Sequence, residues 1–247
     1  MNGALSGKTM LAVEGLSAWY GAARILYDLS FEVGRGEVVA LMGRNGAGKS
    51  TTMKAVMGLI AERQGTVRFN GGDISHLKPF EIARRGLGFT PEDRRIFADL
   101  TVMENLDVGR QPPRSFADGA PAPSWTPSSL FALFPNLAEM PDRLGSHMSG
   151  GEQQMLTVAR TLMGNPLLVL LDEPSEGVAP LIVEQMATTI VELKKEGLSI
   201  LLSEQNIHFA RLVSDRVYVL EKGQIRWQGS MAQLDNNLGV QITYLTV

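Results

Sequence analysis

The sequence of 247 residues contains no cysteine and only three histidines. The absence of cysteine excludes disulfide bonds, zinc ribbons and thiol nucleophiles, because each of these needs a cysteine sulfur. With so few histidines, a structural zinc site is also a poor explanation of the fold. A chain of this length buries a sizeable apolar core without such cross-links.

The sequence also lacks a strong charge imbalance and a long apolar run. Lys and Arg number 23 against 26 Asp and Glu, a formal net charge of −3, so bulk charge predicts binding neither to DNA nor to anionic lipid. No apolar run is long enough for a membrane-spanning helix, and Met1–Val13 lacks the apolar core of a signal peptide. We therefore expect a cytoplasmic protein, held by another subunit if it works at a membrane.

Strand and helix patterns alternate along most of the chain. Short strands are expected at 11–13, 25–29, 31–33 and 66–70. The continuous apolar run Val38–Met42 is typical of a strand buried on both faces of a parallel sheet, and the residues after it recur at the spacing of a helix face. Another helix is expected at 182–193, further strands at 167–171 and 199–203, and a closing hairpin at 216–228. The pattern predicts an α/β core.

Between about Asp93 and Gly164 the strand patterns stop and helical spacing dominates, which predicts a helical insertion into the core. Residues 111–127 hold five of the twelve prolines. That composition predicts a flexible loop, to which we assign no chemistry.

A glycine-rich turn follows Val38–Met42 directly. Its sequence, Gly43-Arg44-Asn45-Gly46-Ala47-Gly48-Lys49-Ser50, matches G-x-x-x-x-G-K-[ST]. Backbone N–H groups of such a turn point at phosphates, and the helix that starts at Lys49 adds its positive end. Lys49 suits the β and γ phosphates, and the Ser50 hydroxyl suits Mg²⁺. The motif predicts a nucleoside triphosphate site made of Gly43, Asn45, Gly46, Ala47, Gly48, Lys49, Ser50 and Thr51.

A second buried strand ends in two carboxylates. Leu167–Leu171 is apolar throughout, and Asp172 and Glu173 follow it. Ligands bind at the carboxyl ends of the strands in open α/β sheets. We therefore expect Asp172 to ligate Mg²⁺ and Glu173 to polarise the attacking water.

A third motif begins at Met148 with the sequence M-S-G-G-E-Q-Q. Ser149 and Glu152 form an S-x-x-E capping box, which predicts a helix start. The free N–H groups there form an anion site for which the same subunit offers no phosphate. The segment resembles the L-S-G-G-Q signature of ATP-binding-cassette (ABC) ATPases, with Met in place of Leu and Glu in place of Gln.

This resemblance covers nearly the whole chain and implies one ABC domain over residues 1–247. The implied fold is α/β, a P-loop NTPase with a mostly parallel core sheet, an N-terminal antiparallel β-subdomain and a helical subdomain insertion. The nucleotide-binding core would comprise 1–92 and 165–247, and the helical subdomain 93–164. The implied cofactors are ATP and Mg²⁺.

In that family, two cassettes sandwich two nucleotides. The resemblance implies that the γ-phosphate held by the other cassette binds to Ser149, Gly150, Gly151 and Glu152. Tyr20 matches the aromatic residue that stacks on adenine. Ser175 and Gly177 lie in the segment that matches the D-loop, which crosses to the partner, although Glu176 departs from its usual pattern.

Two positions depart from the general ABC pattern. The loop that senses Mg²⁺ and the membrane partner usually offers glutamine, where this sequence has Glu92. The switch position, usually histidine, is Gln205, which can donate a hydrogen bond to a γ-phosphate oxygen but cannot carry a proton. With Glu173 and Lys49, these two complete the expected catalytic set. The glutamine predicts lower intrinsic ATPase activity, or a composite dimer whose other site hydrolyses more.

The same departures point to one branch of the family. P-E-D-R-R-I-F at 91–97, L-T-V-M-E-N-L at 100–106 and S-E-Q-N at 203–206 resemble the smaller ATP-binding subunit of branched-chain amino-acid importers, or of related urea and amide importers. The resemblance implies a second, different cassette, two membrane permeases and, indirectly, a periplasmic solute-binding protein, although the sequence leaves open whether the chain also pairs with itself. It places the chain on the inner face of a bacterial plasma membrane, without a nucleic-acid partner.

Other functions remain open at this point. A soluble ABC ATPase acting on nucleic acid or ribosomes usually has tandem cassettes, zinc cysteines or coiled coils, which this sequence lacks. An ATP-gated interaction module with little hydrolysis would explain Gln205 but not Glu173. A P-loop kinase would have no use for the Ser149 motif.

Overall fold

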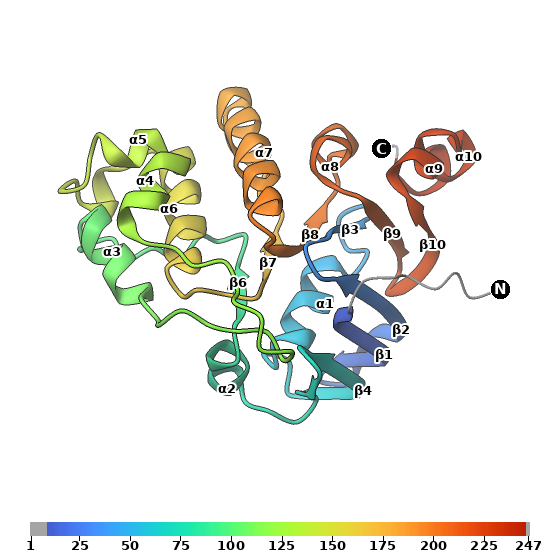
Figure 1. Ribbon diagram of the computed structural model, residues 1–247. Helices are drawn as coiled ribbons and strands as arrows, with labels where there is room; N and C mark the ends of the chain where they lie inside the picture. The colour runs from blue at the N-terminus through green and yellow to red at the C-terminus, as the bar shows by residue number, and fades with distance from the viewer. Residues whose placement is uncertain (1–8, 246–247) are drawn as a thin grey trace.

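The computed structural model describes residues 9–245, which form two β-sheets and several groups of helices (Figure 1). The smaller sheet is antiparallel, with strand order β2-β1-β4-β5. Its strands are β1 (Thr9–Tyr20), β2 (Ala23–Gly34), β4 (Glu62–Phe69) and β5 (Gly72–Asp73).

The expectation of short, separate strands before Val38 is wrong, because β1 and β2 are long and pair as one hairpin. Gly15 has φ +64° and lies where the pairing register shifts between Val13 and Leu16. A residue in that conformation bends a strand as a bulge without ending it. The glycine that suggested a break is therefore internal to the strand.

The larger sheet has the order β10-β9-β3-β8-β7-β6, and all its neighbours pair in parallel except β9 and β10. Every residue of β3, β7 and β8 is buried, which explains why β3 is apolar throughout and why the other two strands have apolar centres. The mostly parallel core sheet is confirmed. Its strands are β3 (Val38–Met42), β6 (Leu87–Thr90), β7 (Leu168–Asp172), β8 (Ser199–Glu204), β9 (Arg216–Glu221) and β10 (Gln224–Ser230).

Helices and the small sheet cover the two faces of the large sheet. Alternate strand residues point to opposite faces, so Val39 and Leu41 pack with the small sheet and α1, while Val38 and Ala40 pack with helices α6, α7 and α8. The helices are α1 (Lys49–Val56), α2 (Pro79–Arg84), α3 (Val102–Gly109), α4 (Pro127–Leu133), α5 (Pro135–Ala138), α6 (Gly150–Leu162), α7 (Pro180–Lys195), α8 (Ile207–Val213), α9 (Met231–Asp235) and α10 (Leu238–Val240). Within residues 9–245, no helix combines the length and apolarity needed to cross a bilayer.

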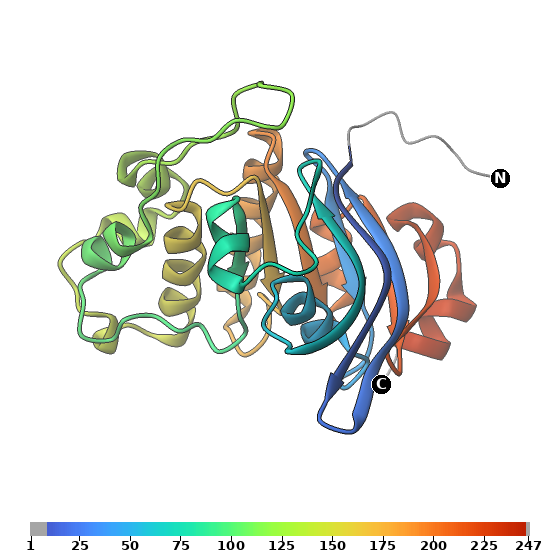
Figure 2. The same ribbon diagram turned by 90° about the horizontal axis from the view of Figure 1, so that it is seen from below.

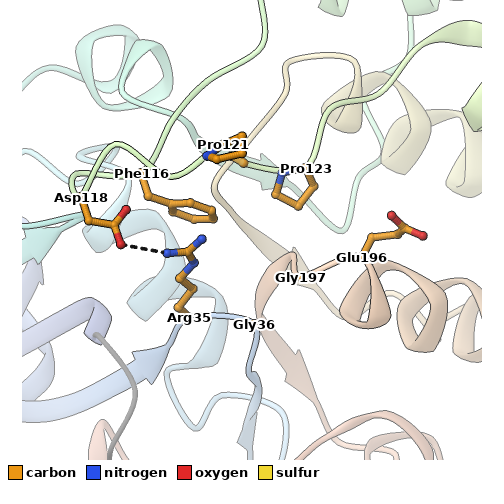
Figure 3. Close-up of a pocket in the computed structure, with 9 residues that line it drawn as sticks. Arg35, Gly36, Phe116, Asp118, Pro121, Pro123, Glu196 and Gly197 are labelled. Carbon is orange, nitrogen blue, oxygen red and sulfur yellow. Dashed lines mark hydrogen bonds and ion pairs between the residues drawn. The ribbon is translucent and has the colours of Figure 1, made fainter.

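Helices α3 to α6 lie together at one end of the molecule (Figure 1). The segment from 111 to 127 leaves this group and runs toward the sheets (Figure 2). This segment, called the strap below, contacts the sheets and the core at several points. The Arg35 guanidinium lies 3.4 Å from the centre of the Phe116 ring and 3.2 Å from the Asp118 carboxylate (Figure 3). The backbone N–H of Trp125 donates to Asn165 Oδ1 at 2.6 Å.

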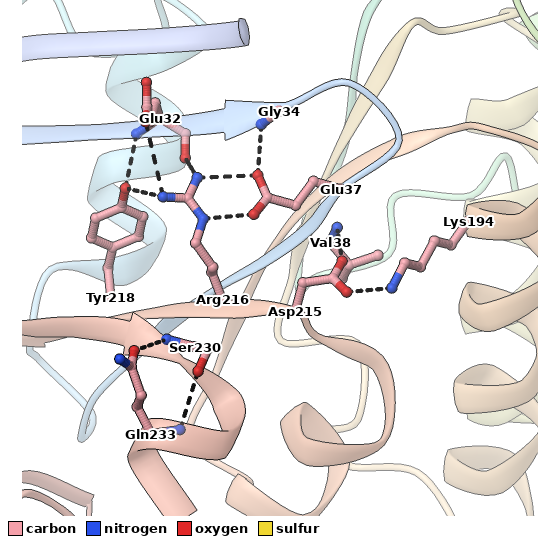
Figure 4. A network of polar contacts seen from close by, with 10 residues as sticks. All are labelled: Glu32, Gly34, Glu37, Val38, Lys194, Asp215, Arg216, Tyr218, Ser230 and Gln233. Carbon is pink, nitrogen blue, oxygen red and sulfur yellow. Dashed lines mark hydrogen bonds and ion pairs between the residues drawn. The ribbon is translucent and has the colours of Figure 1, made fainter. Parts of the chain in front are cut away.

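One arginine, Arg216, joins the two sheets near the start of β3 (Figure 4). Arg216 on β9 donates to both carboxylate oxygens of Glu37, at 2.6 and 3.1 Å, and to the backbone oxygen of Glu32 on β2 at 2.9 Å. Burial of Arg216 opposes its charge, but these acceptors raise its pKa above the ordinary value. The bidentate pair fixes the end of β2 against the start of β3, from which the phosphate-binding turn extends.

Candidate active site

The glycine-rich turn connects β3 to α1 in the conformation that phosphate binding needs. A Cβ atom on Gly43 would lie 2.4 Å from the Leu220 backbone oxygen, so only glycine fits there. Gly48, with φ +107°, caps α1 and offers no side chain to its first turn. The first N–H groups of α1 are therefore left for an anion, as expected from the motif.

Lys49 is buried at the centre of this turn. Its Nζ donates to the backbone oxygens of Gly43 at 2.8 Å and Arg44 at 3.2 Å, and lies 3.0 Å from Glu173 Oε1. Both charged side chains of the pair are less than one-tenth exposed. The structure thus brings the expected phosphate-binding lysine and the expected water-polarising carboxylate into direct contact.

Ser50 and Asp172 face each other as a candidate magnesium site. The Ser50 hydroxyl donates to Asp172 Oδ1 at 2.8 Å. A hydroxyl and a carboxylate are oxygen donors that suit Mg²⁺, which commonly keeps few protein ligands and binds nucleotide phosphates as well. Residues 9–245 contain no cluster of three metal-binding side chains, so a cation here would complete its shell with phosphate and water.

Sequence reasoning missed Ser203, which lies on β8 beside both carboxylates. Its hydroxyl donates to Asp172 Oδ1 at 2.7 Å and accepts from the backbone N–H of Glu173 at 3.0 Å. The one signal for it was a polar residue directly after the apolar run 200–202 of a buried strand. Ser203 fixes Asp172 and the backbone of Glu173 relative to each other.

Glu173 adopts φ +48°, an uncommon conformation for a residue other than glycine. Burial opposes its ionisation, but hydrogen bonds from Glu176 and Lys49, with the Lys49 charge, hold the pKa of Glu173 below its ordinary value. Its second oxygen, Oε2, is buried and accepts no hydrogen bond from an N–H or hydroxyl group among residues 9–245. The hydrogen bond between the two carboxyl groups needs a proton, which a protonated Glu176 supplies.

Glu176, the departure in the D-loop segment, therefore has a physical role. Its hydrogen bond to Glu173, partial burial and the charges of Glu173 and Glu92 raise the pKa of Glu176 to about 7. Two carboxylates this close resist simultaneous ionisation, so the pair retains one proton up to neutral pH.

Glu204, also missed from the sequence, links the D-loop segment to the switch position. It is 1% exposed and accepts from the backbone N–H of Ser175 at 3.0 Å and of Asn206 at 3.2 Å. Burial raises the pKa of Glu204. Gln205 comes next in the chain, half-buried, at the carboxyl end of the central strands.

In the described part of the chain, four expected site residues make no side-chain hydrogen bond to Lys49, Ser50, Asp172 or Glu173. Tyr20 is half-exposed at the end of β1, and Glu92 is exposed after β6. Within residues 9–245, neither Glu92 nor Gln205 makes a side-chain hydrogen bond or an ion pair. Thr51 is partly buried in the first turn of α1.

The signature segment forms the capping box expected from its sequence. Ser149 caps α6, its hydroxyl accepts from the Glu152 N–H at 3.3 Å, and its N–H donates to Glu152 Oε2 at 2.6 Å. The atoms nearest to a Cβ on Gly150 or Gly151 belong to Arg94 and Ile182, and not to the phosphate-binding turn. The anion site at α6 is therefore separate from the one at α1.

Comparison with known proteins agrees with this geometry. The family model described as ABC transporter matches residues 26–176. The chain belongs to the ABC transporter family. It is similar to the high-affinity branched-chain amino acid transport ATP-binding protein BraG of Pseudomonas aeruginosa, with 40% identity covering 96% of this chain and 99% of BraG. It is also similar to the lipopolysaccharide export system ATP-binding protein LptB of Haemophilus influenzae, with 36% identity covering 96% and 97%.

Among solved structures, the ADP conformation of MJ1267, an ATP-binding cassette of an ABC transporter, superimposes with a TM-score of 0.76. The identity is 27%, and the match covers 94% of this chain and 95% of that one. The fold is therefore that of an ABC cassette, and the chain is an ABC-type ATPase that binds nucleotide. The resemblance found in its motifs is confirmed.

Replacing Ser203 by alanine is expected to lower kcat about tenfold with little change in ATP affinity. The loss of two hydrogen bonds costs on the order of 1–3 kcal/mol, and 1.4 kcal/mol corresponds to a factor of ten in rate. Ser199→Ala is the matched control, since Ser199 is buried on the same strand but accepts from the Gly36 N–H at 2.9 Å, away from the site. Steady-state hydrolysis with equal losses of kcat in both variants would contradict a local role for Ser203.

The stability of the nucleotide-free protein is expected to depend on Glu176 and pH. The folded pKa of about 7 exceeds the ordinary value of 4.5, so the folded state binds more protons and stability falls as pH rises between these values. Glu176→Gln imitates the protonated form and removes this loss. The gain in Tm from the substitution should be small at pH 5 and larger at pH 8; an equal gain at both would contradict the shared proton.

Proposed function

We propose that the protein is the ATP-binding and hydrolysing subunit of an ABC importer that takes up branched-chain amino acids or a related small polar solute. The observation that carries the proposal is the cluster of Lys49, Ser50, Asp172 and Glu173 in a chain that is 40% identical to BraG over nearly its whole length. We propose one ABC domain over 1–247, with its core at 1–92 and 165–247 and a helical subdomain at 93–164.

Hydrolysis in this site is an in-line attack of water on the γ-phosphorus. Glu173, held as a carboxylate by Lys49, accepts a hydrogen bond from that water and orients it, while Lys49 and the N–H groups of α1 stabilise charge on the phosphates. Mg²⁺ bound between Ser50 and Asp172 would neutralise charge on the β and γ oxygens. The bond to ADP breaks, and ADP and inorganic phosphate leave.

The remaining site residues act around this centre. Tyr20 stacks on adenine, and Gln205 donates a hydrogen bond to a γ-phosphate oxygen. The Ser149–Glu152 segment binds the nucleotide of a second cassette, and Ser175 and Gly177 cross to that cassette. The two cassettes close on ATP and separate after its hydrolysis. Because ATP binds the closed pair more tightly than the separated pair, this cycle moves the permeases.

A groove between α2, β6 and α3 is suited to receive a permease. It has a volume of about 600 Å³ and begins beside Pro91, next to Glu92. Phe80 and Phe97 line it and are 53% and 47% exposed, with the guanidinium groups of Arg84 and Arg160 at 5.4 and 5.0 Å from their ring centres. Exposed aromatic residues flanked by arginines are typical of protein–protein contact sites.

Docking there would place the chain on the inner face of a bacterial plasma membrane, with two permeases, a second cassette of the same or another kind and, indirectly, a periplasmic solute-binding protein. Glu92 would sense the permease, and no nucleic-acid partner is expected. A second candidate is an export system, which the 36% identity to LptB favours. An ATP-gated module with little hydrolysis is the further alternative.

The test replaces the chromosomal copy in the source bacterium and measures uptake of radiolabelled leucine. Glu173→Gln, which stops hydrolysis, and Phe97→Asp, which places a charge in the groove, should each reduce uptake at least about tenfold. Leu212→Asp is the control, because Leu212 is 63% exposed on α8 and does not line the groove. Unchanged leucine uptake with impaired delivery of lipopolysaccharide to the cell surface would instead support export.

A further inference from the structure

The turn after Glu92 holds two consecutive residues, Arg94 and Arg95, in the left-handed region, with φ +61° and +53°. Such a pair is unfavourable for residues with a Cβ and persists only when the surroundings hold it. Here α6 holds it: Thr157 Oγ1 donates to the Arg94 carbonyl at 3.0 Å, and Arg160 Nη2 donates to the Arg95 carbonyl at 2.6 Å. The left-handed backbone, held by these two hydrogen bonds, sets the direction of the Arg94 and Arg95 side chains.

The Arg94 guanidinium lies against the start of α6. A Cβ atom on Gly150 would lie 2.8 Å from Nη1 and 3.4 Å from Nη2 of Arg94, so the absence of a side chain at Gly150 makes room for the guanidinium. A Cβ on Gly177 in the D-loop segment would lie 3.8 Å from Nη2. Arg94 is thus placed between the two segments that are expected to face a second cassette.

The position is electrostatically unfavourable without an anion. The N-terminus of α6 carries a partial positive charge, and the guanidinium adds a full one beside it. Two neighbouring acidic groups have other partners: Glu152 Oε2 accepts from the Ser149 N–H at 2.6 Å, and Asp93 pairs with Arg95 at 2.7 Å. Within residues 9–245 the Arg94 side chain has no ion pair or hydrogen bond, and its Nε is buried without an acceptor.

We propose that Arg94 is a phosphate-binding residue of the composite site: together with the N-terminal N–H groups of α6, it binds the terminal phosphate of ATP held by a second copy of this chain. The planar guanidinium offers two parallel donors, which match phosphate oxygens. The phosphate supplies the anion that both positive groups lack. This inference rests on the proposed function, because it needs ATP-bound cassettes that pair.

The test compares Arg94 variants in a Glu173→Gln background, in which ATP stays bound. Sedimentation velocity with Mg-ATP gives the dimer dissociation constant, and titration of a fluorescent ATP analogue gives nucleotide affinity in the same proteins. Arg94→Gln should weaken ATP-dependent dimerisation about tenfold or more, the size of one charge-assisted phosphate contact. Nucleotide affinity of the monomer and Tm should stay unchanged, and Arg94→Lys should restore part of the dimerisation.

Arg68→Gln on β4 is the matched control, since Arg68 is an exposed arginine paired with Glu14, away from the site. Equal dimerisation of Arg94→Gln and the parent would overturn the proposal, as would a parent that binds ATP but stays monomeric. A parent that fails to bind ATP would overturn the proposed function itself. A fall in Tm for Arg94→Gln, with no rescue of dimerisation by lysine, would assign Arg94 a structural role instead.

Discussion

The buried pair of Lys49 and Glu173 is the interaction on which the rest of the active site depends. It joins the start of α1 to the end of β7, two elements far apart in the chain, through atoms 3.0 Å apart and almost fully shielded from water. A buried ion pair costs much desolvation energy, so its geometry and its other hydrogen bonds decide whether it persists. The Gly43 and Arg44 carbonyls and the Ser203 contact with the Glu173 backbone meet this requirement.

Three acidic groups, Glu173, Glu176 and Glu204, interact electrostatically around this pair. Glu173 keeps its charge through Lys49, Glu176 holds a proton near neutrality, and Glu204 is buried under the N–H groups of Ser175 and Asn206. Each carboxylate has a different electrostatic environment, which separates their protonation states. The segments around Ser175 and Gln205 are therefore linked to Glu173, the carboxylate expected to polarise water, by hydrogen bonds and charge.

The sequence predicted the parts of this structure that depend on local pattern. The apolar run Val38–Met42 became a fully buried strand, and the Ser149 capping box formed as its spacing indicated. Ser203 could not be assigned in advance, because its role arises from the pairing of β7 with β8. The burial of Phe116 and Trp125 in the strap and the direction of the Arg94 side chain depend on tertiary contacts, which no local pattern shows.

The most direct test of this account is steady-state Mg-ATP hydrolysis by the purified chain over a wide range of protein concentration, with Glu173→Gln in parallel. The account predicts specific activity that rises with concentration, because a second cassette completes the site, and that disappears in the variant. Activity that is independent of concentration and survives the loss of the Glu173 carboxylate would contradict it.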